Sequence, residues 1–347
     1  MIRSLAFVGL SSLALNALIT PLVLWLSHRN EWYDEIDHRK IHLHDTPRLG
    51  GIGIFVSLVT AVVLGLTLLV PSQLMGEPVV LDLVLVGIGF GLMFGLGLYD
   101  DFVNLPALVK LGGQIISATV IALSGLVTSD IVIPYAGTIS LSQPVGIVFA
   151  VFWIVALANA VNLIDGADGM AGSTMLISAA FMGVIALSQG RMVAALLAFA
   201  IAGSLAAFLL SNAPPARIFM GDSGSLTLGA VMATIPLLGL SSDGAMPLFS
   251  SLTLLCIPIL DTALAIGRRL SRGLPIHAPD REHIHHLLID HGYEGKRLLV
   301  VAGAASIVLG IVAALWFAIP ESIALMVTVI TWALIVTLAL RGRRPAS

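Results

Sequence analysis

The hydrophobic positions of the chain fall into long, nearly uninterrupted runs separated by short polar segments. A helix that crosses a bilayer needs about 17–25 apolar residues. Eleven runs have about this length, roughly at 4–27, 51–70, 80–98, 110–127, 144–161, 172–188, 193–211, 224–240, 246–266, 298–318 and 322–340. No segment shows the strict apolar–polar alternation of a half-buried strand. The pattern predicts an all-α, polytopic integral membrane protein, with one transmembrane domain over residues 1–347.

Composition strengthens this prediction. The chain is 58% hydrophobic and only 11% charged, with a mean hydropathy of +1.02. Water-soluble domains are about a quarter charged, so their surface cannot be built from these residues. The first run is too long for a signal-peptide core and has no small-residue cleavage site, so we expect a retained span. Cys256 is the only cysteine, which excludes an intrachain disulfide.

The distribution of charge predicts an orientation. An odd number of spans places the two termini on opposite sides of the membrane. All but two of the 17 Lys and Arg residues then share one side, and only Arg3 and Arg191 lie on the other. Basic residues favour the cytoplasm, so we expect the N-terminus outside and the C-terminus inside. The same side receives all 9 histidines and the candidate acids Asp100, Asp101, Asp165, Asp168 and Asp222, which indicates a function at the cytoplasmic face.

The segment "NAVNLIDGADG" ends the fifth apolar run with polar residues at a spacing of three: Asn159, Asn162, Asp165 and Asp168. This spacing places them along one slowly drifting face of a helix. Carboxylate and amide oxygens suit Mg²⁺ or hydrogen bonds to a polar ligand. The alternative is a helix end capped by Asn and Asp, but four such residues in register favour a functional site.

The segment "LYDDFVNL" places Asp100 and Asp101 side by side after the third run. Adjacent carboxylates repel, so one has a raised pKa unless a cation neutralises the pair. The pair therefore suits metal binding or proton handling. A solvated loop pair is the alternative.

The segment "FMGDSGSLTLG" places Asp222 in a Gly/Ser turn before the eighth run. Exposed N–H groups at a helix start attract phosphate, and Asp222 is a natural second oxygen donor for a metal near Asn162. The alternative is that Ser223 or Ser225 acts as an ordinary N-cap.

The segment "PDREHIHHLLIDHG" carries Arg281, His283, His285 and His286. Three close imidazoles can bind zinc. However, no cysteine accompanies them, and His285 and His286 are expected on different faces of a helix. Imidazole and guanidinium groups fit better as a clamp on a diphosphate.

Two features of the apolar runs suggest structural functions. Gly87, Gly91 and Gly95 form a small-residue ridge on the third run, which predicts helix packing. Asp261 lies about one turn inside the ninth run, where an acid usually has a partner. We expect a nearby basic group to be that partner.

The motifs "DDFVNLPALVK", "NAVNLIDGADGMAG", "FMGDSGSLTLG" and "HIHH" together resemble those of the polyprenyl-phosphate N-acetylhexosamine-1-phosphate transferases, glycosyltransferase family 4. The resemblance runs from about His42 to His291. The "HIHH" loop looks like the undecaprenyl-phosphate alpha-N-acetylglucosaminyl 1-phosphate transferase branch. It looks less like the phospho-N-acetylmuramoyl-pentapeptide transferases, whose loop has another histidine run.

The resemblance implies a site residue by residue. Asp222 and Asn162 match positions that hold a metal, expected to be Mg²⁺ with Mn²⁺ as a substitute. Asp165, Asp168 and Phe219 match the nucleotide pocket, with Phe219 against uracil. The remaining matches are Asp100, Asp101 and Lys110 near the lipid phosphate, and His283, His285 and His286, with Arg281, over the diphosphate.

The implied activity is transfer of N-acetylglucosamine 1-phosphate from UDP-N-acetylglucosamine to undecaprenyl phosphate, releasing UMP. It would be the first membrane step of a cell-surface polysaccharide such as lipopolysaccharide O-antigen, in the bacterial inner membrane. The alternatives are another UDP-N-acetylhexosamine or UDP-MurNAc-pentapeptide as donor. We expect no nucleic-acid partner and leave a homodimer open. An ion-coupled transporter would need charges near the bilayer midplane, whereas the acids here gather at one face.

Overall fold

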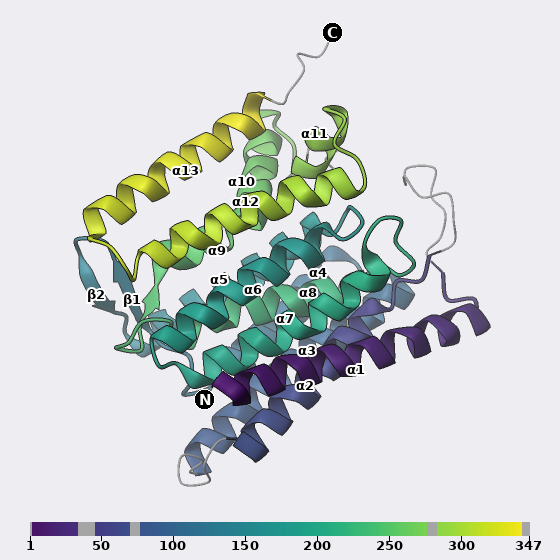
Figure 1. Ribbon diagram of the computed structural model, residues 1–347, viewed down its shortest axis with the longest axis horizontal. Coiled ribbons are helices and arrows are strands. Elements are labelled where there is room, and N and C mark those ends of the chain that lie inside the picture. The colour runs from purple at the N-terminus through teal and green to yellow at the C-terminus, as the bar shows by residue number, and fades with distance from the viewer. Residues whose placement is uncertain (1, 34–45, 70–76, 276–282, 342–347) are drawn as a thin grey trace.

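A computed structural model describes residues 2–33, 46–69, 77–275 and 283–341 of the chain (Figure 1). Its helices are α1 (Ile2–Arg29), α2 (Gly50–Leu69), α3 (Glu77–Val103), α4 (Ala107–Ala122), α5 (Gln143–Ile164), α6 (Met170–Ser188), α7 (Met192–Asn212), α8 (Gly221–Leu237), α9 (Leu248–Leu254), α10 (Cys256–Ser271), α11 (Ile284–Asp290), α12 (Lys296–Leu315) and α13 (Glu321–Arg341). Its strands are β1 (Asp130–Ile133), β2 (Gly137–Ser140) and β3 (Met246–Pro247).

The predicted all-α membrane class is confirmed. Within the described residues, 8 helices are long and apolar enough to cross a membrane, and a bent pair brings the number to 9 at most. Each predicted apolar run coincides with a helix or with this pair. The count of eleven spans is not confirmed, because α4 and α8 have only 16 and 17 residues.

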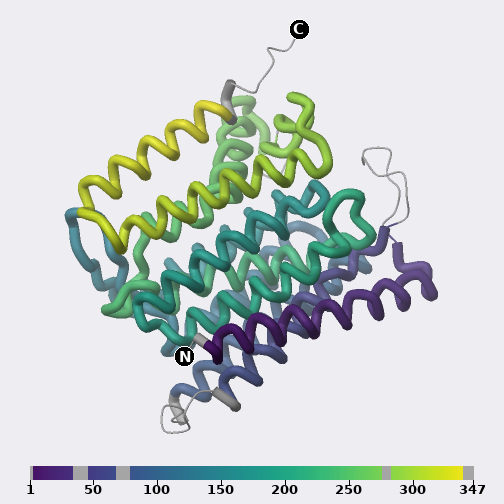
Figure 2. The backbone as a smooth tube through the Cα atoms, in the orientation of Figure 1, coloured from purple at the N-terminus to yellow at the C-terminus, as the bar shows by residue number. Residues whose placement is uncertain are grey.

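The ninth predicted run is not one straight helix, because α9 and α10 meet at an angle of 82° around Leu255. Pro258 explains the break. Its ring has no N–H to donate to the carbonyl of Leu254 and would clash with it in a regular helix. Ser178 donates its hydroxyl to that freed carbonyl at 2.7 Å. Figure 2 shows α10 leaving the direction of the main bundle.

Helix α8 is the centre of the bundle, and its residues from Ser223 to Leu237 are all buried. It packs against α3, α5 and α2. Gly97 of α3 lies against the backbone of Asp222, and a Cβ there would clash with the Asp222 carbonyl. The missing side chain therefore lets α3 approach the start of α8.

The predicted packing ridge on α3 is wrong. A Cβ added at Gly87, Gly91 or Gly95 would meet nothing within 4 Å. Gly89 and Gly97 make the close contacts instead, with α4 and α8. Periodicity identifies a small-residue face, but the positions of the neighbouring helices decide which face is packed.

Buried polar side chains of α1, α2 and α7 form a hydrogen-bonded network. Asn16 of α1 donates to the backbone oxygen of Ser204 on α7 at 2.8 Å and accepts from Thr20, also at 2.8 Å. The hydroxyls of Ser57 on α2 and Ser204 lie 2.8 Å apart. Away from water an unpaired polar group is costly, so this network favours one arrangement of α1, α2 and α7.

A small sheet corrects the expectation of no strands. Its order is β2-β1-β3, with β1 antiparallel to β2 and parallel to β3. Ile131 pairs with Ile139 in the first ladder and with Met246 in the second. Strands of four and two residues are too short to reveal alternation. In Figure 1, β1 and β2 lie at the opposite end of the bundle from α11.

Candidate active site

Four of the predicted site residues meet at one end of the bundle. Asp100 lies at the end of α3, Lys110 near the start of α4, Asn162 near the end of α5 and Asp222 at the start of α8. We call these four residues the polar cluster. The chain folds so that alternate helix ends come to the same side, which is why residues more than 120 positions apart become neighbours.

Lys110 bridges two carboxylates within the polar cluster. Its Nζ lies 2.7 Å from Oδ2 of Asp100 and also contacts Oδ2 of Asp222. The backbone N–H of Leu105 donates to the other oxygen of Asp100 at 2.6 Å. Asp100 is only 7% exposed, so its charge needs such partners. The ammonium group of Lys110 thus lies between the carboxylates of α3 and α8.

Asn162 connects α5 to the start of α8. Its Nδ2 donates to Oδ1 of Asp222 at 3.0 Å and to the hydroxyl of Ser225 at 2.8 Å. The Ser225 hydroxyl donates in turn to the carbonyl of Gly221 at 2.9 Å. Asn162 and Asp222, predicted together as metal ligands, are therefore in direct contact.

Asp101 lies beside the polar cluster but binds backbone rather than Lys110. Its carboxylate accepts the N–H groups of Asp222 at 2.6 Å and of Ser223 at 3.0 Å. A carboxylate at a helix start satisfies N–H groups that have no helical partner. The N-cap position, Met220, makes no side-chain cap. Hence neither Ser223 nor Ser225 is the N-cap of α8. The carboxylate of Asp101 binds the N–H groups at the start of α8 that the sequence predicted to attract phosphate.

The four polar residues of "NAVNLIDGADG" point to different neighbours. Helix α5 ends at Ile164, so only the two asparagines lie on it. Asn159 exchanges hydrogen bonds with Gln114 of α4, at 2.6 and 3.3 Å. Asp168 accepts the N–H of Ala216 at 2.9 Å, in the segment between α7 and α8. Asp168 therefore lies beyond the end of α5 and binds the segment that leads into α8.

Asp165 follows α5 in a crowded acidic environment. Burial and then the negative charges of Asp222, Asp101 and Asp168 raise the pKa of Asp165 well above its usual range. Like charges this close favour a bound cation. Mg²⁺ commonly uses one or two carboxylates, with water and substrate phosphates completing its shell.

Asp222 and Asn162 are the candidate protein ligands for such an ion. The described residues contain no group of three or more His, Cys, Asp or Glu side chains that could hold a metal. Asp222 offers carboxylate oxygens and Asn162 an amide oxygen, on side chains joined by the hydrogen bond from Nδ2 of Asn162 to Oδ1 of Asp222. These residues fit a Mg²⁺ ion that shares its coordination with a phosphate ligand, and they do not fit a metal held by protein alone.

Asp261 of α10 holds the start of the histidine segment. Its Oδ2 lies 2.8 Å from Nδ1 of His283, and its Oδ1 accepts the N–H of Ile284 at 2.7 Å. The basic partner expected for Asp261 is thus His283. Both side chains are buried.

His285 packs against the loop that follows α5. A Cβ added at Gly166 would lie 2.8 Å from Cε1 of His285. The His285 and His286 rings lie 4.2 Å apart between centroids, so the expectation that they point to separate faces is wrong. Burial, followed by the charge of His286, lowers the pKa of His285 to about 4. At neutral pH it can contact a diphosphate through an N–H, not through a positive charge.

Phe219 is anchored by its backbone. Its N–H donates to the carbonyl of Pro47 at 2.8 Å, and its carbonyl accepts the N–H of Gly50 at 3.0 Å. The ring is half-buried, and its contact with uracil stays a prediction. Arg281 lies outside the described residues.

An apolar groove of about 530 Å³ lies between α4 and α5, close to the helix positions of Lys110 and Asn162. It is lined by Leu111, Ile115, Thr119, Ile147, Val148, Val151, Phe152, Val155, Ala156 and Asn159. Asn159 stands one turn before Asn162 on α5, and Leu111 follows Lys110 on α4. The apolar lining of the groove therefore lies next to the charged side chains in the sequence of both helices.

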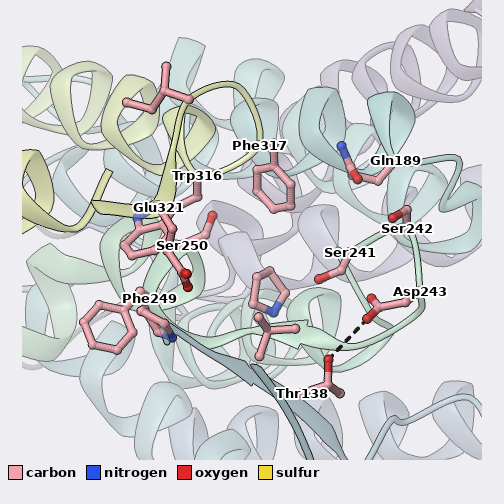
Figure 3. Close-up of a pocket in the computed structure, with 14 residues that line it drawn as sticks. Thr138, Gln189, Ser241, Ser242, Asp243, Phe249, Ser250, Trp316, Phe317 and Glu321 are labelled. Atoms are coloured by element: carbon pink, nitrogen blue, oxygen red, sulfur yellow. Dashed lines mark hydrogen bonds between the residues drawn. The ribbon is translucent and has the colours of Figure 1, made fainter. Parts of the chain in front are cut away.

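A second hollow, of about 400 Å³, lies at the end of the bundle that carries the sheet (Figure 3). Asp243 accepts the Thr138 hydroxyl there at 3.4 Å, and Trp316 and Phe317 line the wall. None of the predicted site residues with described positions lines it. It is separate from the polar cluster.

Comparison with known proteins identifies the family of the chain. Residues 83–240 match the model of Glycosyl transferase family 4. The chain is 34% identical over 293 residues to a probable undecaprenyl-phosphate N-acetylglucosaminyl 1-phosphate transferase of Bacillus subtilis (strain 168), covering 84% of this chain and 78% of that protein. It is 32% identical over 324 residues to a decaprenyl-phosphate N-acetylglucosaminephosphotransferase of Mycobacterium leprae (strain TN), covering 86% and 80%.

A third relative is more distant. An undecaprenyl-phosphate alpha-N-acetylglucosaminyl 1-phosphate transferase of Yersinia pestis is 28% identical over 298 residues, with 83% of this chain and 78% of that protein covered. The region that matches the family model, residues 83–240, holds Asp100, Asp101, Lys110, Asn162 and Asp222. The sequence resemblance is confirmed: the chain belongs to glycosyl transferase family 4 and is a sugar-phosphate transferase.

Proposed function

We propose that the chain transfers N-acetylglucosamine 1-phosphate from UDP-N-acetylglucosamine to undecaprenyl phosphate, giving undecaprenyl-diphospho-N-acetylglucosamine and UMP. The observation that carries the proposal is the polar cluster at the end of an apolar groove. Such a junction suits a reaction between a charged, soluble donor and a lipid. The names of the B. subtilis and Y. pestis relatives support both substrates.

The α4–α5 groove is the proposed site of the polyprenyl tail. Its lining is apolar except for Thr119 and Asn159, and the Thr119 hydroxyl is already bonded to the carbonyl of Ile115 at 2.7 Å. A tail in this groove brings its phosphate toward Lys110 and Asn162. The ammonium group of Lys110 then neutralises part of the phosphate charge.

The proposed reaction is a direct displacement at the sugar-bearing phosphorus of the donor. An oxygen of the lipid phosphate bonds to that phosphorus, and the bond from phosphorus to the oxygen bridging the two phosphates breaks, so UMP leaves. A phosphate monoester has a second pKa of about 6 and is mostly dianionic at pH 7. A strong general base is therefore not required. The alternative is a two-step route through a phosphorylated carboxylate.

The chain's own residues position the two substrates. Asp100 holds Lys110 and is available to accept the remaining proton of the lipid phosphate. Asp101 holds the start of α8, and with it Asp222. The residues assigned to the donor are Asp165, Asp168 and Phe219 at the nucleotide, and His283, His285, His286 and Arg281 at the diphosphate.

Asp222 and Asn162 are the proposed protein ligands of Mg²⁺, with Mn²⁺ as a substitute. When bound, the ion neutralises charge that develops on the diphosphate. The concentration of acids around Asp222, with Asp101 and Asp165 close by, supports this assignment, because such a group of negative charges favours a bound cation. The proposed setting is the bacterial inner membrane, with the polar cluster facing the cytoplasm. The proposed pathway is that of lipopolysaccharide O-antigen, and a homodimer is left open.

The experiment uses the purified full chain in detergent with Mg²⁺, undecaprenyl phosphate and radiolabelled UDP-N-acetylglucosamine. The expected result is label in the lipid phase together with UMP, both lost with EDTA. If UDP-N-acetylgalactosamine gives the lipid product and UDP-N-acetylglucosamine does not, the assignment of UDP-N-acetylglucosamine as donor is overturned. No product from any UDP-N-acetylhexosamine, in folded protein, would overturn the transferase proposal and favour an ion-coupled transporter. Protein that carries the labelled sugar phosphate after incubation with the donor alone, with release of UMP, would favour the two-step route.

A further inference from the structure

We propose that Gln114 is a positioning residue that fixes α4, and with it Lys110, against α5. The inference rests on the proposed function, because it assigns Gln114 a part in the same transfer. Gln114 lies four residues after Lys110 on α4, so both side chains point to the same face of that helix. Gln114 is only 1% exposed, although it lies on a helix with many lipid-facing side chains.

The amide of Gln114 is bound reciprocally by Asn159. Asn159 donates from Nδ2 to Oε1 of Gln114 at 2.6 Å, and Gln114 donates from Nε2 to Oδ1 of Asn159 at 3.3 Å. Asn159 also donates to the carbonyl of Val155 at 2.8 Å, which fixes its side chain on α5. Two amides that satisfy each other in an apolar environment define the spacing of their helices.

This pair is a second link between α4 and α5 beside the polar cluster. In the first link, Lys110 of α4 binds Asp222, and Asp222 accepts from Asn162 on α5. One turn away on each helix, Asn159 of α5 binds Gln114 of α4. Loss of Gln114 removes the second link, so α4 and the Lys110 it carries can shift relative to α5.

The pair also lies beside the apolar groove. Asn159 lines the groove one turn before Asn162, and the buried Gln114 holds the Asn159 side chain there. The pair therefore links the groove lining to the parts of α4 and α5 that carry Lys110 and Asn162. Misplacing a catalytic group by about 1 Å can cost about 100-fold in rate, so a small movement of α4 is expected to affect turnover.

The test is a double-mutant cycle of Gln114→Ala and Asn159→Ala, measured as kcat and KM for each substrate. Gln114→Ala is expected to lower kcat by about 10- to 100-fold, with KM for UDP-N-acetylglucosamine within about twofold. If the two amides act as a unit, the double variant is no slower than the worse single variant. The conservative variant Gln114→Glu keeps the acceptor for Asn159 and is expected to retain more activity than Gln114→Ala.

Ser117→Ala is the matched control, because Ser117 is buried on the same helix and donates to the carbonyl of Gly89 on α3 at 2.6 Å. It removes one interhelical hydrogen bond away from the site and is expected to change the apparent Tm but not kcat. Additive losses in the cycle, or wild-type kcat in Gln114→Ala, would overturn the positioning role. An inactive wild-type protein would instead overturn the proposed function, so the two failures are distinct.

Discussion

The carboxylate of Asp101 on α3 accepts the backbone N–H of Asp222 on α8 at 2.6 Å. The same carboxylate accepts the N–H of Ser223 at 3.0 Å, so one side chain closes the first turn of the most buried helix. The adjacent Asp100 binds Lys110 instead. Two neighbouring acids therefore have different partners, and their functions can be separated by mutation.

Replacement of Asp101 distinguishes a positioning function from proton transfer. Asp101→Asn keeps one oxygen that can accept an N–H at the helix start, whereas Asp101→Ala removes both. We expect Asn to retain measurable turnover, and Ala to lose about tenfold more and lower the apparent Tm. Steady-state kinetics with thermal unfolding measure both. Equal inactivity of the two variants, with unchanged Tm, would assign Asp101 to the chemistry.

Asp222→Ala is expected to abolish turnover and to weaken Mg²⁺ activation. The change removes a carboxylate that contacts both Lys110 and Asn162. The measurement is initial rate against Mg²⁺ concentration in EDTA-treated protein, with Asp243→Ala as the control because Asp243 lies at the other end of the bundle. Near-normal activity of Asp222→Ala would remove it from the metal site.

Gly166→Ala tests the contact between the loop after α5 and the histidine segment. The new Cβ would lie 2.8 and 2.9 Å from ring atoms of His285, so one of the two must move. We expect turnover to fall by about tenfold or more with little change in Tm. Gly112→Ala is the control, since a Cβ there meets nothing within 4 Å and the change adds up to about 1 kcal/mol of helix propensity. Wild-type activity of Gly166→Ala would show that the His285 position is not critical.

The buried His285 predicts a pH dependence of stability. Its folded pKa is about 4, below the ordinary value of about 6.5, so the unfolded chain binds more protons between these values. Stability is therefore full above about pH 6.5 and falls as pH drops toward 4, by up to about 3 kcal/mol. The neighbouring His286, His283 and Asp261 modify the shift.

Thermal unfolding of the detergent-solubilised protein from pH 7 to 4.5 measures this effect. His285→Gln is expected to flatten the dependence and to reduce turnover without unfolding the helices. A variant with the same pH slope as the wild-type protein would contradict the assignment to His285.

Much of the architecture follows from the sequence by itself. Bilayer thickness sets the length of an apolar run, so each predicted run coincides with a helix or, at α9 and α10, with a bent pair. The same alternation of spans brings the ends of α3 and α5 and the starts of α4 and α8 to one end of the bundle. Asp100, Lys110, Asn162 and Asp222 could therefore be predicted as neighbours before any coordinate was known.

Only the tertiary structure decided which of these side chains bind one another. Periodicity gives the direction of a side chain relative to its own helix but not the rotation of the neighbouring helix. For that reason the sequence does not show that Asp101 caps α8 while the adjacent Asp100 binds Lys110. Nor does it show that Gly97 packs against α8 while a Cβ at Gly91 would meet nothing within 4 Å. Gln114 carries no motif signal, because a lone amide in an apolar run acquires meaning only from the partner that α5 brings to it, Asn159.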